Sequence, residues 1–228
     1  MRPKRIFPLG ENAMTIEFGN EISEPLNDAA MSLAAYFDKN RFPGFVEAVP
    51  AIASVTIFFK LAEVRKNLAD NSTAFEFVKH TVENALTDAD NIPVINSRVV
   101  EVPISFSKQH SVDLQVIAEV SRLSADKVIE IFLSKTYRVY MLGFLPGFAY
   151  MGIVDERIAV PRKTSPRLIV PKGSVGIAGQ QTGIYPNESP GGWQIIGRTD
   201  LELITSDEAS PCLFHPGDTV RFVNVTDR

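Results

Sequence analysis

Glycine is distributed very unevenly along this chain. Three of its 14 glycines precede residue 143, and the other eleven lie from Gly143 onward. In that later part no helical period persists, and Gly, Pro and Asn turns separate short apolar segments at intervals of about 8 to 12 residues. This spacing is typical of a β-sandwich or a β-barrel. The expected strands are Ile158–Val160, Leu168–Val170, Val175–Ala178, Gln194–Ile196, Leu201–Thr205 and Thr219–Val223.

Residues 1–90 have a different pattern, in which short strands alternate with amphipathic helices. Met14, Ile16 and Phe18 alternate with smaller or polar neighbours, which indicates a half-buried strand. The other elements expected here are helices over 26–37 and 73–86 and strands over 45–49 and 53–59. Together these elements predict a compact α+β unit, a sheet covered on one face by two helices.

A polar stretch, Asp88–Pro93, ends in proline and is the expected linker. It divides the chain into two predicted domains, 1–90 and 91–228. The second domain is expected to open with strands at Val100–Ile104 and Thr136–Leu142 and helices at Val112–Val120 and Ala125–Leu133, the latter capped by Ser124. The predicted fold class is therefore an α+β N-terminal domain followed by a mainly β domain.

The overall composition excludes several classes of protein. The chain has 228 residues, of which 45% are hydrophobic. It has 23 basic and 27 acidic side chains, which give a net charge of −4. These values exclude intrinsic disorder and disfavour a general nucleic-acid binder. The single cysteine, Cys212, excludes an internal disulfide framework and Cys-cluster metal sites. No apolar run approaches the roughly 20 residues of a membrane helix. We expect a soluble, cytoplasmic protein with no metal site and no nucleic-acid or membrane partner.

The sequence lacks the standard catalytic motifs. It has no G-x-x-x-x-G-K-[ST] phosphate loop and no G-x-S-x-G element around a nucleophilic serine. Glycines recur every third residue over Gly173–Gly179, but Gln180–Pro186 cannot begin the helix that a dinucleotide-binding loop requires. The catalytic residues are therefore unknown at this stage.

A basic stretch carries the strongest chemical signal. Between Glu156 and Glu188 there is no acidic residue, whereas five residues are basic: Arg157, Arg162, Lys163, Arg167 and Lys172. Arg162 and Arg167 each follow a proline, which restricts the backbone that carries the guanidinium. A guanidinium can bind a carboxylate or a phosphate through two parallel hydrogen bonds.

These residues predict a pocket for a small anionic or amide-bearing substrate. The predicted binding residues are Arg162, Arg167, Gln180, Gln181, Tyr185, Trp193 and Arg198. The alternative is a solvated basic rim on a β-domain. A second candidate is the apolar, glycine-rich segment Met141–Met151, which has no helical period. It forms either a loop that closes a pocket or meets a partner, or part of the core, through Phe144, Leu145, Pro146, Phe148 and Tyr150.

Several blocks, in order along the chain, resemble one family. The run YRVYMLGFLPGFAYMG at 137–152 resembles the motif of the PxpB/KipI family, also called allophanate hydrolase subunit 1. Similar blocks follow: AVPR at 159–162, GSVGIAGQQTGIYP at 173–186, SPGGWQIIGRT at 189–199 and PGDTVRF at 216–222. The resemblance is strong over about residues 98–225. It implies an α+β N-terminal domain followed by a cyclophilin-like β-barrel domain.

The resemblance also implies an activity and partners. It implies a subunit of an ATP-dependent 5-oxoprolinase, which opens 5-oxoproline to L-glutamate together with a PxpA-like subunit and a PxpC-like subunit of the allophanate hydrolase subunit 2 family. ATP is the implied cofactor of the complex and need not bind this chain. Because the chain has no phosphate loop, we expect it to be inactive in isolation. The substrate carboxylate would suit a bidentate arginine such as Arg162 or Arg167.

Two alternative functions stay open. They are a KipI-like inhibitor of a sensor histidine kinase and a carboxyltransferase-like subunit for a urea-type substrate. One stretch also departs from the family pattern. Many relatives have Gly-Gly-Glu…Gly-Pro-Asp-Leu after the first strand of the second domain, whereas this chain reads SFSKQHSVDL at 105–114. Only Asp113-Leu114 is retained, so an acidic group is missing if this loop lines the site.

Overall fold

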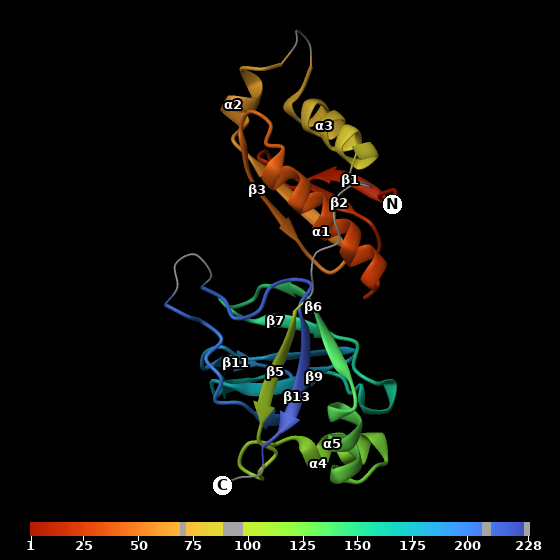
Figure 1. Cartoon of the computed structure of the whole chain (residues 1–228), viewed down its shortest axis with the longest axis vertical. Helices are drawn as coiled ribbons and strands as arrows, with labels where there is room; N and C mark the ends of the chain where they lie inside the picture. Colours follow the sequence, from red (N-terminus) through yellow and green to blue (C-terminus); the bar gives the residue numbers. More distant parts are fainter. Residues whose placement is uncertain (69–71, 89–97, 207–210, 226–228) are drawn as a thin grey trace. The chain divides into compact units, whose positions relative to one another are not determined.

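The fold is described by a computed structural model for residues 1–68, 72–88, 98–206 and 211–225. The chain divides into two compact units, Met1–Asn96 and Ser97–Arg228 (Figure 1). Each unit has its own hydrophobic core. Apart from Asp88, the predicted linker Asp88–Pro93 lies outside the described residues.

The first unit is a four-stranded antiparallel sheet with helices on one face (Figure 1). The strand order is β1 (Arg5–Pro8), β2 (Ala13–Glu17), β4 (Ser54–Phe59) and β3 (Phe45–Pro50). The helices are α1 (Glu24–Lys39), α2 (Leu61–Arg65) and α3 (Ala74–Asp88). Val55, Ile57 and Phe59 alternate along β4 and share one core with the apolar faces of α1 and α3. The predicted α+β unit is confirmed, while β1 and α2 were not predicted.

The second unit contains a seven-stranded sheet that curls into a nearly closed barrel. In spatial order its strands are β12 (Gln194–Arg198), β9 (Ser174–Ala178), β10 (Gln181–Ile184), β7 (Ala149–Gly152), β6 (Thr136–Leu142), β13 (Thr219–Asn224) and β5 (Val99–Ile104). The two edges meet at Ser105 and Arg198, which exchange backbone hydrogen bonds of 2.8 and 3.0 Å. The sheet therefore closes on itself at this bridge, and the predicted mainly β barrel is confirmed.

Shorter elements complete the second unit. They are α4 (Leu114–Ser121), α5 (Ala125–Leu133), the 3-10 turn η2 (Glu156–Ile158), and a two-stranded ribbon of β8 (Arg167–Val170) and β11 (Ser189–Gly191). Ser124 caps α5 as predicted, because its hydroxyl accepts a hydrogen bond from the Lys127 backbone N–H at 3.2 Å. In the barrel core, the Phe132 ring lies 5.0 Å from that of Tyr137 and 4.9 Å from that of Phe222.

Two predicted strands are wrong. At Ile158–Val160 the chain forms the end of η2 and then irregular structure, because the Asp155 carboxylate accepts the Arg157 backbone N–H at 3.1 Å and caps a tight turn. Leu201–Thr205 does not join the barrel sheet. It pairs with residues 211–213 instead, through the Ile204–Cys212 bridge and a 2.9 Å bond from Leu213 N–H to the Leu203 carbonyl. Both segments bury apolar side chains. The apolar pattern in the sequence therefore predicted correctly that these segments are buried, but not whether they pair with another strand.

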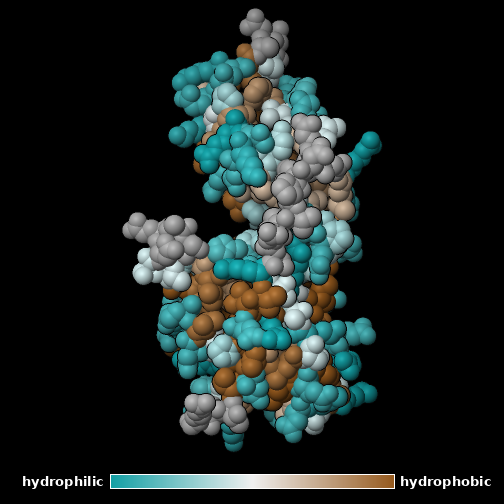
Figure 2. All heavy atoms as spheres, viewed as in Figure 1, coloured by the Kyte–Doolittle hydropathy of each residue, from teal (hydrophilic) through white to brown (hydrophobic). Residues whose placement is uncertain are grey.

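The surface of the second unit has apolar and polar areas side by side. Figure 2 shows apolar atoms over the face that carries β5 and β13, where Val99, Val223 and Val225 are exposed. Among the described residues, no helix has the length and apolar character needed to cross a membrane.

Candidate functional site

The aromatic segment and the basic stretch meet at a pocket of about 260 Å³ in the second unit, here called the aromatic pocket. Its aromatic and basic lining residues are Phe144, Phe148, Tyr150, Tyr185, Trp193, Arg162 and Lys163. They come from the turn between β6 and β7 and from β7 itself, from the loop before β8, and from the chain on both sides of β11. The tertiary structure thus joins two segments that the sequence singled out separately.

Phe148 is the centre of the aromatic cluster. Its ring meets those of Tyr150, Tyr185 and Trp193 edge-on, at centroid distances of 4.9, 5.4 and 5.5 Å. Edge-to-face contacts of this kind are favourable beyond the area they bury. Phe148, Tyr185 and Trp193 are all buried, so the floor of the pocket is preorganised.

Glycines on the neighbouring strands make room for these rings. A Cβ on Gly191 would lie 2.3 Å from the Tyr185 hydroxyl oxygen, and a Cβ on Gly183 would lie 2.9 Å from Phe148 Cζ. Both distances are far below van der Waals contact, so the rings can lie against β10 and β11 only where the strand has no side chain. The late glycines and the aromatic residues therefore belong to one packing arrangement.

Phe144 holds its ring at the mouth of the pocket. Its φ of 71° is in the left-handed region, which is uncommon for a residue other than glycine and costs roughly 1–2 kcal/mol. The side chain is 60% exposed, yet its ring contacts Phe148 edge-on at 5.5 Å. Strained backbone of this kind persists where surrounding contacts hold it and is frequent at binding sites.

Arg162 is a cation of this pocket that forms no ion pair with any residue the structure describes. Its guanidinium lies over the Trp193 ring, 5.8 Å from the centroid, and the side chain is exposed. None of the described carboxylates pairs with it. A guanidinium that is fixed against an aromatic face and lacks a counter-ion is suited to bind a carboxylate or a phosphate.

Arg167 has a different environment, because it is already paired. Its two terminal nitrogens donate to the Asp113 carboxylate at 2.7 and 2.6 Å. The same carboxylate accepts the backbone N–H of Ile195 at 2.7 Å and lies 3.3 Å from Lys163 Nζ. Arg167 therefore holds the basic stretch against α4 and β12. Of the predicted arginines, Arg162 is the one that lines the aromatic pocket.

The sequence assigned no role to Asp113, the carboxylate that pairs with Arg167. It is only 2% exposed, and this burial favours the neutral acid. The hydrogen bonds from Arg167 and Ile195 and the charges of Arg167 and Lys163 more than offset the burial, so the pKa of Asp113 lies below its usual value. The available signal was the retained Asp113-Leu114 pair in an otherwise divergent loop.

The remaining predicted residues lie elsewhere. Gln180 and Gln181 are at the turn between β9 and β10, where the Gln180 carbonyl accepts the Val154 N–H at 2.9 Å. Arg198 is at the barrel closure and lines a separate cavity. Leu145 packs against the aromatic cluster, and Pro146 is exposed. The structure thus brings together Arg162, Tyr185 and Trp193 with Phe144, Phe148 and Tyr150.

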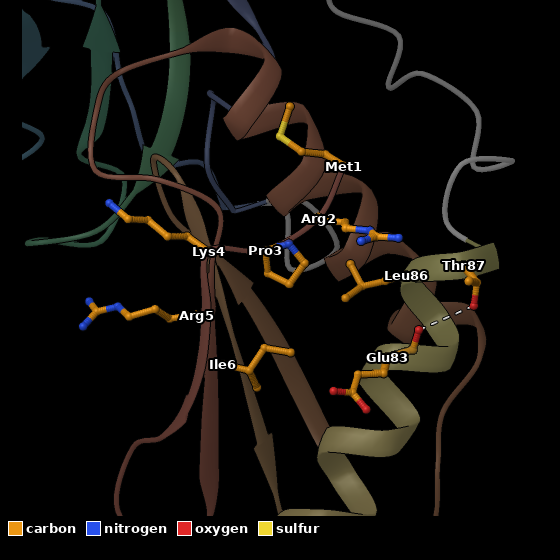
Figure 3. A pocket seen from close by; sticks show the side chains of 9 residues that line it. All are labelled: Met1, Arg2, Pro3, Lys4, Arg5, Ile6, Glu83, Leu86 and Thr87. Atoms are coloured by element: carbon orange, nitrogen blue, oxygen red, sulfur yellow. Dashed lines mark hydrogen bonds between the residues drawn. The ribbon is translucent and has the colours of Figure 1, made fainter.

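A larger cavity, of about 650 Å³, lies in the first unit between the start of β1 and the end of α3 (Figure 3). In Figure 3, Lys4 and Arg5 extend away from Glu83 and Leu86, whereas Arg2 extends toward the end of α3, so the basic side chains of this cavity do not converge. Arg5 is also paired with Glu17, at 2.6 Å. Nowhere in the described part of the chain do three or more His, Cys, Asp or Glu side chains gather to hold a metal ion.

Residues 4–214 match the model of the carboxyltransferase domain, subdomain C and D. The chain belongs to this carboxyltransferase family. The B subunit of the 5-oxoprolinase of Bacillus subtilis (strain 168) is 45% identical over 225 residues, which cover 98% of this chain and 94% of that protein. Its counterpart in Escherichia coli O157:H7, also the B subunit of a 5-oxoprolinase, is 35% identical, with 98% and 97% covered. These matches confirm the resemblance based on the blocks at 137–152 and 173–199.

The carboxyltransferase fold is also found in a much longer protein. The Kluyveromyces lactis urea carboxylase structure superimposes with a TM-score of 0.76 over 97% of this chain and 22% of that chain. At 20% identity this likeness shows the fold alone. It supports the α+β unit followed by a β-barrel unit as a family architecture.

Proposed function

We propose that this carboxyltransferase-family chain is the B subunit of a 5-oxoprolinase, a hydrolase complex that opens 5-oxoproline to L-glutamate with ATP hydrolysis. The observation that carries the proposal is the 45% identity to the Bacillus subtilis B subunit over nearly the full length of both chains. The urea amidolyase of Saccharomyces cerevisiae is only 25% identical to this chain, which favours the 5-oxoprolinase subunit over the urea-type alternative.

The aromatic pocket is the proposed binding site for 5-oxoproline. Arg162 would hold the substrate carboxylate, and the flat lactam ring would lie against Trp193. Burial raises the pKa of Tyr185, against smaller opposing effects of the Trp193 backbone and Arg162, so its hydroxyl stays protonated at neutral pH. A protonated hydroxyl at the pocket wall can donate to an oxygen on which negative charge develops.

Other subunits are proposed to supply the rest of the reaction. ATP would phosphorylate the lactam oxygen with release of ADP, after which water adds to that carbon, the ring C–N bond breaks, and glutamate and phosphate leave. The chain has no phosphate loop in its sequence, so we assign ATP binding to a PxpA-like or PxpC-like partner. The role of this chain is then to bind and orient the lactam.

Reconstitution of the complex tests the proposed function. The chain would be purified with the PxpA-like and PxpC-like subunits, and glutamate release from 5-oxoproline measured with and without ATP. We expect product only from the full mixture with ATP. An assembled complex without product would overturn the proposal, and turnover by the isolated chain would contradict the assignment of ATP binding. Urea-dependent carboxylation, or inhibition of a histidine kinase, would favour one of the alternatives.

The role of Arg162 has a specific test in that complex. Arg162→Gln removes the charge but keeps a polar side chain, and we expect the KM for 5-oxoproline to rise about 10- to 100-fold with a smaller change in kcat. Arg157→Gln is the matched control, because Arg157 lies in the same basic stretch but pairs with Asp155 at 2.8 Å. An unchanged KM in Arg162→Gln would remove Arg162 from the substrate site.

A further inference from the structure

A second cavity, of about 190 Å³, lies where the barrel closes, and it is here called the closure cavity. On its polar side are Gln109, His110, Arg167 and Arg198, and on its apolar side are Val112, Ile169 and Ile195. We propose that the closure cavity binds a small oxyanion, a carboxylate or a phosphate, with Arg198 as its principal partner.

Arg198 is a partly buried cation without a counter-ion. Its backbone is fixed by the two hydrogen bonds with Ser105 that close the barrel. Its side chain forms no ion pair with any described residue, and its Nε is buried without a hydrogen-bond partner. A guanidinium that loses water without gaining a partner is costly, and an anion in the cavity would supply that partner.

His110 provides a second oriented polar group. Its Nδ1 lies 3.0 Å from the Ser105 hydroxyl, which fixes the ring plane and leaves Nε2 for a bound anion. The loop that carries His110 is itself held in place, because the Ser111 hydroxyl donates to the carbonyls of Phe106 and Ser107 at 3.0 and 2.9 Å. The site is therefore built on a closed barrel seam and a braced loop.

The charge balance of the cavity favours an anion over a cation. None of its described lining residues is acidic. Arg167, which also lines the cavity, is neutralised by the Asp113 carboxylate through two short hydrogen bonds. Asp113 does not pair with Arg198, so the charge of Arg198 is not balanced in this way.

The size and walls of the closure cavity limit the ligand. A volume of about 190 Å³ corresponds to roughly six water molecules, enough for one small anion and too little for a nucleotide. The apolar wall of Val112, Ile169 and Ile195 also suits a carboxylate with a short apolar chain. Arg162 does not line this cavity, so it is a different site from the aromatic pocket.

Binding to the full chain, without partner subunits, tests this inference independently of the proposed function. Inorganic phosphate and propionate would be titrated separately at constant ionic strength, with calorimetry for affinity and NMR of the His110 ring for location. We expect saturable binding of at least one anion and a shift of the His110 resonances. Binding of phosphate alone or of propionate alone supports the site and assigns its ligand class.

Variants locate the bound anion. We expect Arg198→Gln to weaken binding at least about 10-fold, because it removes charge-assisted hydrogen bonds. Arg157→Gln should leave affinity unchanged, because Arg157 pairs with Asp155 and lines neither the closure cavity nor the aromatic pocket. If Arg198→Gln does not fold, His110→Gln, which alters the loop and not the barrel strands, gives the same test. The inference would be overturned if neither anion bound saturably. It would also be overturned if the variant that folds, Arg198→Gln or His110→Gln, bound the anion as tightly as the wild type.

Discussion

Gly191 and Gly192 are neighbours in the sequence with very different surroundings. A Cβ on Gly191 would overlap the Tyr185 hydroxyl at 2.3 Å, whereas a Cβ on Gly192 would meet nothing closer than Pro166 Cγ, at 3.6 Å. The pair therefore separates the general effect of losing a glycine from the specific effect of filling the space beneath Tyr185.

We expect Gly191→Ala to lower the free energy of unfolding by about 1–3 kcal/mol, since Tyr185 is buried and its ring must shift. Gly192→Ala should change it by less than about 0.5 kcal/mol. Trp193 is the single tryptophan of the chain and lies in the same cluster, so its fluorescence should shift in Gly191→Ala alone. Equal effects of the two variants would show that Tyr185 does not require Gly191.

Asp113 acts at the same scale, as one carboxylate that holds three segments together. We expect Asp113→Asn to cost about 2–3 kcal/mol at pH 7, because it leaves Arg167 without its counter-ion. The pKa of Asp113 is lowered in the folded state, so its contribution is complete above the unfolded value of about 3.9 and is lost as the pH falls further. The difference between wild type and variant should therefore shrink below about pH 4.

Urea unfolding at pH 7 and at pH 3 measures this prediction for Asp113. Asp200→Asn is the control, because Asp200 is an exposed loop residue. A destabilisation by Asp113→Asn that is the same at both pH values would contradict the ionic role of Asp113.

At the scale of elements, the parallel pair of β5 and β13 joins the beginning of the second unit to its end. Six residues of each strand are in register, from Thr219 opposite Val99 to Asn224 opposite Ile104. Two ion pairs connect this region. Arg98 donates to the Asp218 carboxylate at 2.9–3.0 Å, with Asp218 4% exposed, while Arg221 and Glu101 pair on the surface.

These two pairs predict unequal contributions to stability. Asp218→Asn should destabilise the second unit by about 2–4 kcal/mol, since Asp218 also accepts the His215 N–H at 2.8 Å and is buried. Glu101→Gln should cost at most about 0.5 kcal/mol, because both partners are more than half exposed. Thermal unfolding of the two variants measures the difference, and equal shifts would contradict the importance of burial here.

At the scale of the whole molecule, the described residues of each unit form hydrophobic clusters of their own. The core of the first unit is formed by residues up to Leu86, and that of the second by residues from Val100 onward. A domain with its own core can unfold without the other.

We therefore expect two unfolding transitions. Trp193 lies in the second unit, so its fluorescence should follow that unit alone, whereas far-ultraviolet circular dichroism should follow both. Gly191→Ala should lower the fluorescence-detected midpoint and leave the transition of the first unit unchanged. A single transition, shifted equally for both probes, would show that the units unfold together.

Much of the fold was predictable because local patterns agree with it. Alternation along β2 and β4, helical spacing in α1, α3 and α5, and the Ser124 cap all depend on residues close in sequence. The strands at Ile158–Val160 and Leu201–Thr205 were wrong, since whether an apolar segment joins a sheet depends on a distant partner.

The sequence by itself determined the two kinds of unit, the turn-dense β-region, the family, and the residue types from which an anion site could be built. Only the tertiary structure decided which of the predicted arginines is paired and which stay available to a ligand. The sequence does not distinguish Arg162, Arg167 and Arg198 from one another. In the structure Arg167 is paired with Asp113, some fifty residues earlier in the chain. Pairing between distant residues is set by how the barrel closes, and neither composition nor spacing encodes it.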